Sequence, residues 1–89
     1  MATMHLIIKG KVQGVFFRAS AKKVADNLGV FGWIRNTHNG EVEAEISSEP
    51  EKVQQFINWC NRGPEDALVI DIVITVLEDK HFHDFKILR

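Results

Sequence analysis

The segment VFGWIRNTHNGEVEAEI, residues 30–46, decides the fold because it contains two strands and the turn between them. Residues 30–36 are bulky and β-prone, and Asn39-Gly40 is a strong hairpin signal. After the turn, apolar residues alternate with glutamates: Val42, Ala44 and Ile46 against Glu41, Glu43 and Glu45. This alternation predicts an antiparallel strand with one buried face and one solvated face. The glutamate row is interpreted as the solvated face rather than as a cation site.

A strand and a helix are predicted ahead of this hairpin. Residues 4–12 contain Met4, Leu6 and Ile8 in alternation, which indicates a strand with one face toward a core. The apolar residues that follow recur at helical spacing: Phe17, Ala21, Val24, Ala25 and Leu28. Because Gly29 can adopt the left-handed conformation that commonly ends a helix, we expect a helix of about three turns.

A second helix and a long strand are predicted after the hairpin. Ser48 and Glu51 have the spacing of a capping box, and Pro50 suits a first helical turn. An apolar stripe then runs toward Gly63-Pro64: Val53, Phe56, Ile57 and Cys60. Residues 68–77 read as a strand with four branched residues on one face: Ile70, Ile72, Ile74 and Val76. Residues 82–88 can add a short further strand.

This order of elements, β-α-β-β-α-β with a short extra C-terminal strand, predicts an α+β ferredoxin-like sandwich. A right-handed crossover makes the first two strands parallel, and the hairpin lets the third strand lie between them, antiparallel to both. Both helices then cover one face of an antiparallel sheet. The first and second strands end at the same edge, about 10 Å apart at two strand spacings, so side chains from both ends can meet.

Length and composition limit what the chain can be. Eighty-nine residues suffice for one domain, residues 1–89, and 45% hydrophobic with 26% charged residues predicts one globular core. A net charge of −1 argues against holding a polyanion, so no nucleic-acid partner is expected. The single cysteine, Cys60, cannot form an internal disulfide and is expected to be a buried thiol. We expect a cytoplasmic protein with no membrane partner, because neither a signal peptide nor a membrane-spanning run is evident.

The turn after the first predicted strand, from Gly10 to Arg18, is a candidate anion site. A glycine-bearing turn that runs into a helix can aim successive backbone N–H groups at an anion. Arg18 lies where the helix starts, and its guanidinium there either holds an anion or is a solvated arginine after an ordinary turn. Asn36 closes the second strand at the same edge, where its amide either holds a water or bonds nearby backbone.

Two other interpretations, a metal site and a base-stacking surface, are not favoured. His81 and His83 lie two apart on the expected last strand, but no third ligand is evident, so no metal is expected. Trp33, Phe16 and Phe17 could stack on bases as in RNA-recognition domains. Their basic-aromatic segment, however, closes a turn into a helix instead of lying on a central strand.

Two segments closely resemble the signature motifs of the acylphosphatase family: Gly10-x-Val12-Gln13-Gly14-Val15-x-Phe17-Arg18 and Gly32-Trp33-Ile34-Arg35-Asn36-x-x-x-Gly40-x-Val42. Their order and separation also agree with the family. Two later landmarks look similar as well, Arg62-Gly63-Pro64 after the second helix and the closing Phe85-x-Ile87. The resemblance therefore covers almost the whole chain.

The resemblance implies an enzyme that hydrolyses the carboxyl–phosphate bond of small acyl phosphates without a metal or cofactor, and an enzyme this small can work as a monomer. It assigns phosphate binding to Arg18 and the orientation of the attacking water to Asn36. It also assigns a phosphate cradle to the turn, which comprises Gln13, Gly14, Val15, Phe16 and Phe17. In this cradle Gly14 would let the backbone approach the phosphate closely, and the residues after it would offer amides.

One position departs from the family pattern. The second signature usually carries a glycine where this chain has Ser48, a position that we expect to enter the second helix, away from the pocket. The departure therefore bears on local loop geometry and not on the chemistry. The alternative function is a non-catalytic anion-binding or interaction module with the same fold, which could retain both Arg18 and Asn36.

Overall fold

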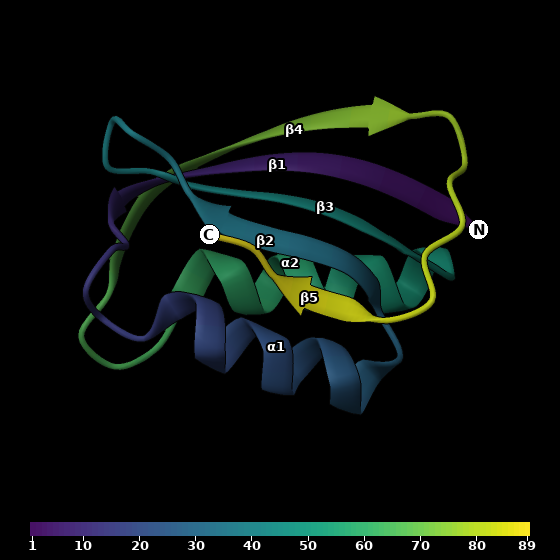
Figure 1. Cartoon of the computed structure of the whole chain (residues 1–89), viewed down its shortest axis with the longest axis horizontal. Helices are drawn as coiled ribbons and strands as arrows, with labels where there is room; N and C mark the ends of the chain where they lie inside the picture. The colour runs from purple at the N-terminus through teal and green to yellow at the C-terminus, as the bar shows by residue number, and fades with distance from the viewer.

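The computed structural model describes residues 1–89 and has the predicted order of strands and helices (Figure 1). The elements are β1 (Ala2–Lys11), α1 (Phe17–Leu28), β2 (Phe31–Asn36), β3 (Val42–Ser48), α2 (Pro50–Arg62), β4 (Leu68–Leu77) and β5 (Phe85–Ile87). Neither helix is long and apolar enough to cross a membrane.

The five strands form one sheet in the order β4-β1-β3-β2-β5. As predicted, β3 lies between β1 and β2 and is antiparallel to both. The short C-terminal strand β5 pairs in parallel with β2, with Ile34 opposite Ile87, so the sheet is mixed at this edge. The α+β ferredoxin-like architecture is therefore confirmed, with one parallel pairing added by β5.

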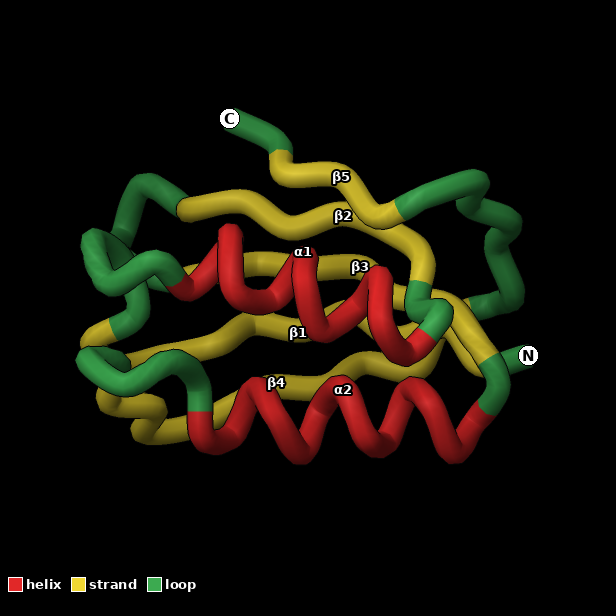
Figure 2. Tube along the Cα trace, turned by 90° about the horizontal axis from the view of Figure 1, so that it is seen from below, coloured by secondary structure: helices red, strands yellow, loops and turns green.

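Both helices pack on the same face of the sheet, which buries their apolar stripes (Figure 2). An aromatic layer lies between them and the sheet. The rings of Phe17 on α1 and Trp59 on α2 are 5.3 Å apart, and those of Phe56 and Phe85 are 5.7 Å apart. Because Phe17 is the first residue of α1 and is almost fully buried, this packing fixes the position of the first turn of α1.

The two helices begin and end partly as predicted. Gly29 ends α1 in the left-handed conformation, at φ 79°, and Pro50 opens α2. The predicted capping box is wrong, because Ser48 is the last residue of β3 and Glu49 occupies the N-cap without a side-chain hydrogen bond. The Ser48 hydroxyl instead donates a 2.8 Å hydrogen bond to the carbonyl oxygen of Gly29. This buried hydroxyl joins the start of α2 to the end of α1.

The edge strand β4 carries its apolar residues less regularly than predicted. Ile72 and Ile74 pair with buried residues of β1 on the helix-covered face. A shift of register between Lys9 and Gly10 falls opposite Ile70, which is 76% exposed. Ile74 and Val76 are also exposed, at 46% and 73%, so only Ile72 of the four expected stripe residues is half-buried.

The last strand is shorter than the 82–88 segment that we expected. β5 begins at Phe85, and His81 and His83 lie in the loop that precedes it. The two histidines therefore do not share a strand face, which corrects the expectation from their spacing.

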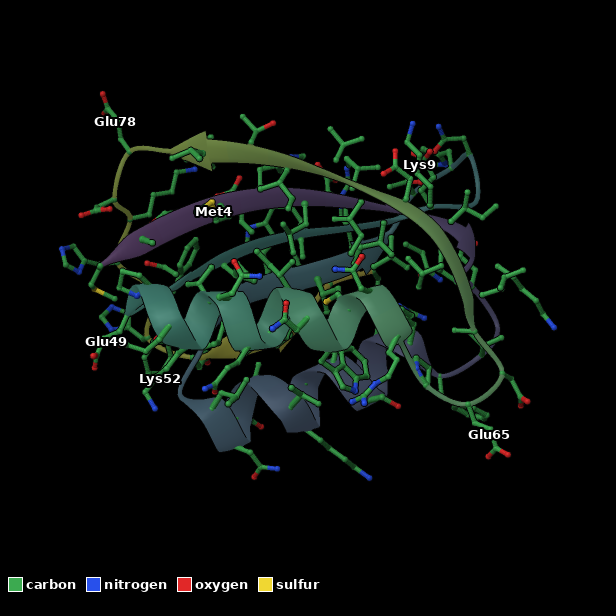
Figure 3. All side chains as sticks on the ribbon, turned by 180° about the vertical axis from the view of Figure 1, so that it is seen from behind. Met4, Lys9, Glu49, Lys52, Glu65 and Glu78 are labelled. Carbon is green, nitrogen blue, oxygen red and sulfur yellow. The ribbon has the colours of Figure 1, made fainter.

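The glutamate row of β3 is not simply solvated, as the alternation suggested. On the sheet face that the helices leave uncovered, each of these carboxylates has a cationic or imidazole partner. The pairs are His5 and Arg35 with Glu43 at 2.6 Å, Lys80 with Glu45 at 2.8 Å, and Lys9, labelled in Figure 3, with Glu41 at 3.8 Å.

Candidate active site

A cavity of about 720 Å³ opens where the first turn of α1 meets the ends of β2 and β5. Its lining comes from Val12 and Gly14 of the β1–α1 turn, Phe16–Ala19 at the start of α1, Asn36 at the end of β2, and Ile87 and Arg89. No aspartate or glutamate lines this cavity. The predicted meeting of the strand ends therefore occurs here, in a cavity suited to an anion.

The β1–α1 turn has an unusual backbone conformation. Gly14 and Phe16 both lie in the left-handed region, with φ values of 74° and 63°. The conformation is free for glycine but costs about 1–2 kcal/mol for phenylalanine. Phe16 is 81% exposed, so burial of its side chain does not offset this cost. Strain of this kind clusters at functional sites, because only the surrounding structure maintains it.

The backbone N–H groups from Gly14 to Ala19 form an unpaired row. The first bonded N–H in this stretch is that of Ser20, which donates to the carbonyl oxygen of Phe16 at 3.0 Å. The N-cap residue Phe16 offers no side-chain acceptor, and the first turn of α1 contains no acidic residue. The row of N–H donors and the positive end of the helix dipole are therefore both available to an anion.

Arg18 brings a cation to the same place. The side chain is half-buried in the first turn of α1 and lines the cavity. It belongs to none of the five ion pairs of the protein. An arginine at a helix N-terminus opposes the helix dipole, so an anion held between its guanidinium and the backbone N–H groups would stabilise this arrangement.

Gln13 ties the turn to the residues that follow Asn36. Its Nε2 donates hydrogen bonds to the carbonyl oxygens of Thr37 at 2.9 Å and Glu41 at 2.8 Å. The side-chain donors of Gln13 are thus used within the protein, and Gln13 does not line the cavity. This side chain instead holds the end of β2 at a fixed place relative to the β1–α1 turn.

Five of the residues predicted from the sequence line the cavity together: Gly14, Phe16, Phe17, Arg18 and Asn36. Val15 lies apart from them, because its side chain is buried in the core. Sequence reasoning missed four lining residues: Val12, Ala19, Ile87 and Arg89. The Phe85-x-Ile87 pattern was the only signal for the C-terminal wall, since a strand of three residues has no readable periodicity.

Other reactive side chains lie apart from this cavity. His81 and His83 border a shallow pocket that contains no residue of the cavity lining. No three His, Cys, Asp or Glu side chains gather anywhere in a set that could hold a metal ion. Cys60 is buried on α2, and burial raises the pKa of its thiol far above the ordinary value. The thiol is therefore uncharged and unreactive.

Comparisons with known proteins show the family of this chain. The family model for acylphosphatase matches residues 4–87. A curated acylphosphatase of Syntrophus aciditrophicus is 44% identical over 91 residues, which cover 99% of this chain and 93% of that protein. Another, from Anaeromyxobacter sp., is 47% identical over 75 residues, which cover 84% of this chain and 81% of that protein.

A solved structure is similar over its full length. The crystal structure of acylphosphatase from Bacillus subtilis superposes with a TM-score of 0.96 at 30% sequence identity, and all of both chains is covered. The chain therefore belongs to the acylphosphatase family and is an enzyme that hydrolyses acyl phosphates.

Proposed function

We propose that acyl phosphate hydrolysis takes place in the cavity beside α1, where Arg18 and the backbone from Gly14 to Phe17 hold the phosphate and Asn36 holds the attacking water. One observation carries this proposal: the unpaired N–H groups from Gly14 to Ala19 border a cavity that Arg18 lines and no acidic residue does. A phosphate bears the negative charge that this surface lacks.

In the proposed step, the water oxygen bonds to phosphorus as the bond from phosphorus to the acyl oxygen breaks. The products are a carboxylate and inorganic phosphate. Phosphoryl transfer asks the protein mainly to position the groups and to stabilise charge on the equatorial oxygens, which backbone donors and one guanidinium can do. The amide of Asn36 orients the water but is not a base, so the water proton passes to a phosphate oxygen of the substrate.

The proposal uses no metal ion and no cofactor. A carboxylate is a good leaving group, so the bridging oxygen needs no strong general acid. The cavity lining accordingly contains no His, Cys, Asp or Glu that would protonate the leaving group or hold a metal. The remaining catalytic task is electrostatic, and Arg18 with the backbone N–H groups performs it.

Steady-state kinetics with benzoyl phosphate and EDTA test these roles. Arg18→Ala should lower kcat/KM by about 10²-fold or more, because both binding and transition-state stabilisation are lost. Asn36→Ala should lower kcat by about 10²-fold with a smaller change in KM, because the phosphate contacts remain. Circular dichroism should show both variants folded.

Arg62→Ala and Asn58→Ala are matched controls, because both side chains are exposed on α2 and lie outside the cavity. Each should keep the wild-type kinetics. Turnover near the wild-type value by folded Asn36→Ala would remove the water-positioning role. A folded wild-type protein that binds phosphate but hydrolyses no acyl phosphate would instead be the anion-binding module.

The domain organisation, oligomeric state, location and partners of the enzyme are also proposals. We infer that residues 1–89 act as a single acylphosphatase domain, because one sheet and two helices share one core. We infer a monomer in the cytoplasm without nucleic-acid or membrane partners. The net charge of −1 argues against a nucleic-acid partner, and a single free cysteine suits the reducing cytoplasm. Size-exclusion chromatography coupled to light scattering tests the oligomeric state.

A further inference from the structure

Arg89 is a second arginine on the cavity wall, and the proposed phosphate site does not use it. Its place follows from the parallel pairing of β2 with β5, in which Ile34 lies opposite Ile87. The pairing continues past β5, because the N–H of Leu88 donates a 2.8 Å hydrogen bond to the carbonyl oxygen of Ile34. The last hydrogen bond to β2 is therefore made one residue before Arg89.

The same register, extended by two residues, brings Arg89 beside Asn36. Side chains alternate between the two faces of a sheet, so Arg89 shares the face of Ile87, and both line the cavity. Leu88 and Lys86 border the shallow pocket instead. The alternation and the cavity lining agree that Arg89 belongs to the same cavity as Arg18.

Two arginines and no aspartate or glutamate thus line the cavity. Neither Arg18 nor Arg89 takes part in an ion pair of the protein. The cavity volume of about 720 Å³ lies within the range of small-molecule sites and exceeds what a phosphate group fills. If Arg18 and the turn hold the phosphate, one cation and much of the cavity are left for the rest of the substrate.

The apolar residues at the cavity suggest how that remaining space is used. Phe16 is 81% exposed and Ile87 is 39% exposed, and both line the cavity. Exposed apolar side chains beside a cation suit a ligand with a hydrocarbon part and a further negative charge. An acyl group that ends in a carboxylate has this composition.

We propose, on the basis of the proposed function, that Arg89 binds a second anionic group on the acyl part of the substrate. The preferred substrates are then acyl phosphates of dicarboxylic acids. In an in-line displacement the acyl group leaves on the side of phosphorus opposite the water that Asn36 holds. Because Arg89 lies beside Asn36, its long side chain has to extend across the cavity for its guanidinium to meet the second carboxylate.

Two substrates of the same shape test this inference. 4-Carboxybenzoyl phosphate carries the additional charge, and 4-carbamoylbenzoyl phosphate replaces that carboxylate by a neutral amide. The quantity measured is the ratio of their kcat/KM values. Arg89→Gln should lower this ratio by about fivefold relative to wild type, the effect of one exposed ion pair. Added salt should lower the wild-type ratio and leave that of the variant nearly constant.

Lys86→Gln is the matched control, because it removes the same charge from β5 outside the cavity and should leave the ratio unchanged. An equal ratio in wild type and Arg89→Gln would overturn the inference. An equal loss of kcat/KM for both substrates would also overturn it, because Arg89 would then bind the phosphate. Full activity of Arg18→Ala on both substrates would instead overturn the proposed function, and with it this inference.

Discussion

The side-chain amide of Gln13 donates a 2.9 Å hydrogen bond to the carbonyl oxygen of Thr37, the residue that follows Asn36. A second hydrogen bond from the same nitrogen, to Glu41 at 2.8 Å, closes the link between the turn before α1 and the loop after β2. The proposed phosphate site and the proposed water site belong to these two segments. One side chain therefore sets their separation.

Gln13→Leu should lower kcat for benzoyl phosphate by about 10-fold, because the loop that follows Asn36 is no longer fixed against the turn. The lost hydrogen bonds should also lower the free energy of unfolding by about 1–3 kcal/mol, measured by urea denaturation. Gln54→Leu is the control, since Gln54 is exposed on α2 and bonds only to Asn58. Undiminished kcat in Gln13→Leu would show that the link does not position the site.

Phe16→Asn should raise the free energy of unfolding by about 1 kcal/mol, because asparagine adopts a left-handed backbone more readily than phenylalanine. Little buried apolar surface is lost, since Phe16 is 81% exposed. Phe16→Ala removes the ring but keeps the backbone penalty, so it should not stabilise the protein. Equal midpoints of urea denaturation for the two variants would argue against strain at this position.

Gly32→Ala should destabilise the protein by about 3 kcal/mol or more, because its φ of 140° is unfavourable and an added Cβ would collide with the carbonyl oxygen of Glu45. Gly40→Ala provides the comparison. Gly40 also has a positive φ, 87°, but an added Cβ there meets nothing within 4 Å. Gly40→Ala should therefore lower the free energy of unfolding by only about 1 kcal/mol. Stability is measured by thermal denaturation. Equal losses of stability in the two variants would mean that the collision at Gly32 adds nothing.

The stability contributed by Glu43 should disappear in acid. The hydrogen bond with His5 lowers the pKa of Glu43 below its ordinary value of 4.5, and nearby Arg35 acts in the same direction against the opposing effect of burial. A carboxylate with a lowered pKa in the folded protein stabilises it above the unfolded pKa, and this stability is lost as pH falls through the folded pKa. The free energy of unfolding of wild type should therefore exceed that of Glu43→Gln by a smaller amount below pH 4.5.

Urea unfolding, followed by tryptophan fluorescence from neutral to acidic pH, measures this difference. Glu65→Gln is the control, because Glu65 is exposed in the turn between α2 and β4 and has no ion-pair partner (Figure 3). It should show no pH-dependent difference from wild type. A Glu43→Gln difference that stays constant through the acid range would mean that the pKa is not lowered.

Much of the fold and the centre of the site could be predicted, because they depend on local chemistry and on connection rules. Gly29 ends α1 as its conformational freedom suggests, and Asn39-Gly40 marks the turn between β2 and β3. The order of elements and the right-handed crossover were enough to bring Arg18 and Asn36 into one cavity.

The features that could not be predicted depend on partners far away in the sequence. The Ser48 hydroxyl follows capping-box spacing, yet it bonds the carbonyl of Gly29 on the other side of the hairpin. The donors of Gln13 likewise find acceptors after Asn36, and no spacing rule points to them. Arg89 reaches the cavity wall only because β5 pairs in parallel with β2, and three residues are too few to reveal that pairing.

β5 is held more firmly at its Phe85 end than at its Ile87 end. Phe85 is buried, and its carbonyl oxygen accepts a 2.8 Å hydrogen bond from Lys22 of α1, whereas Ile87 is partly exposed. β2 is the only strand that β5 touches. Local unfolding from the Ile87 side would therefore expose amides to hydrogen exchange at a free energy well below that of global unfolding. Such local unfolding would separate the C-terminal wall of the cavity from β2 while the core stays folded.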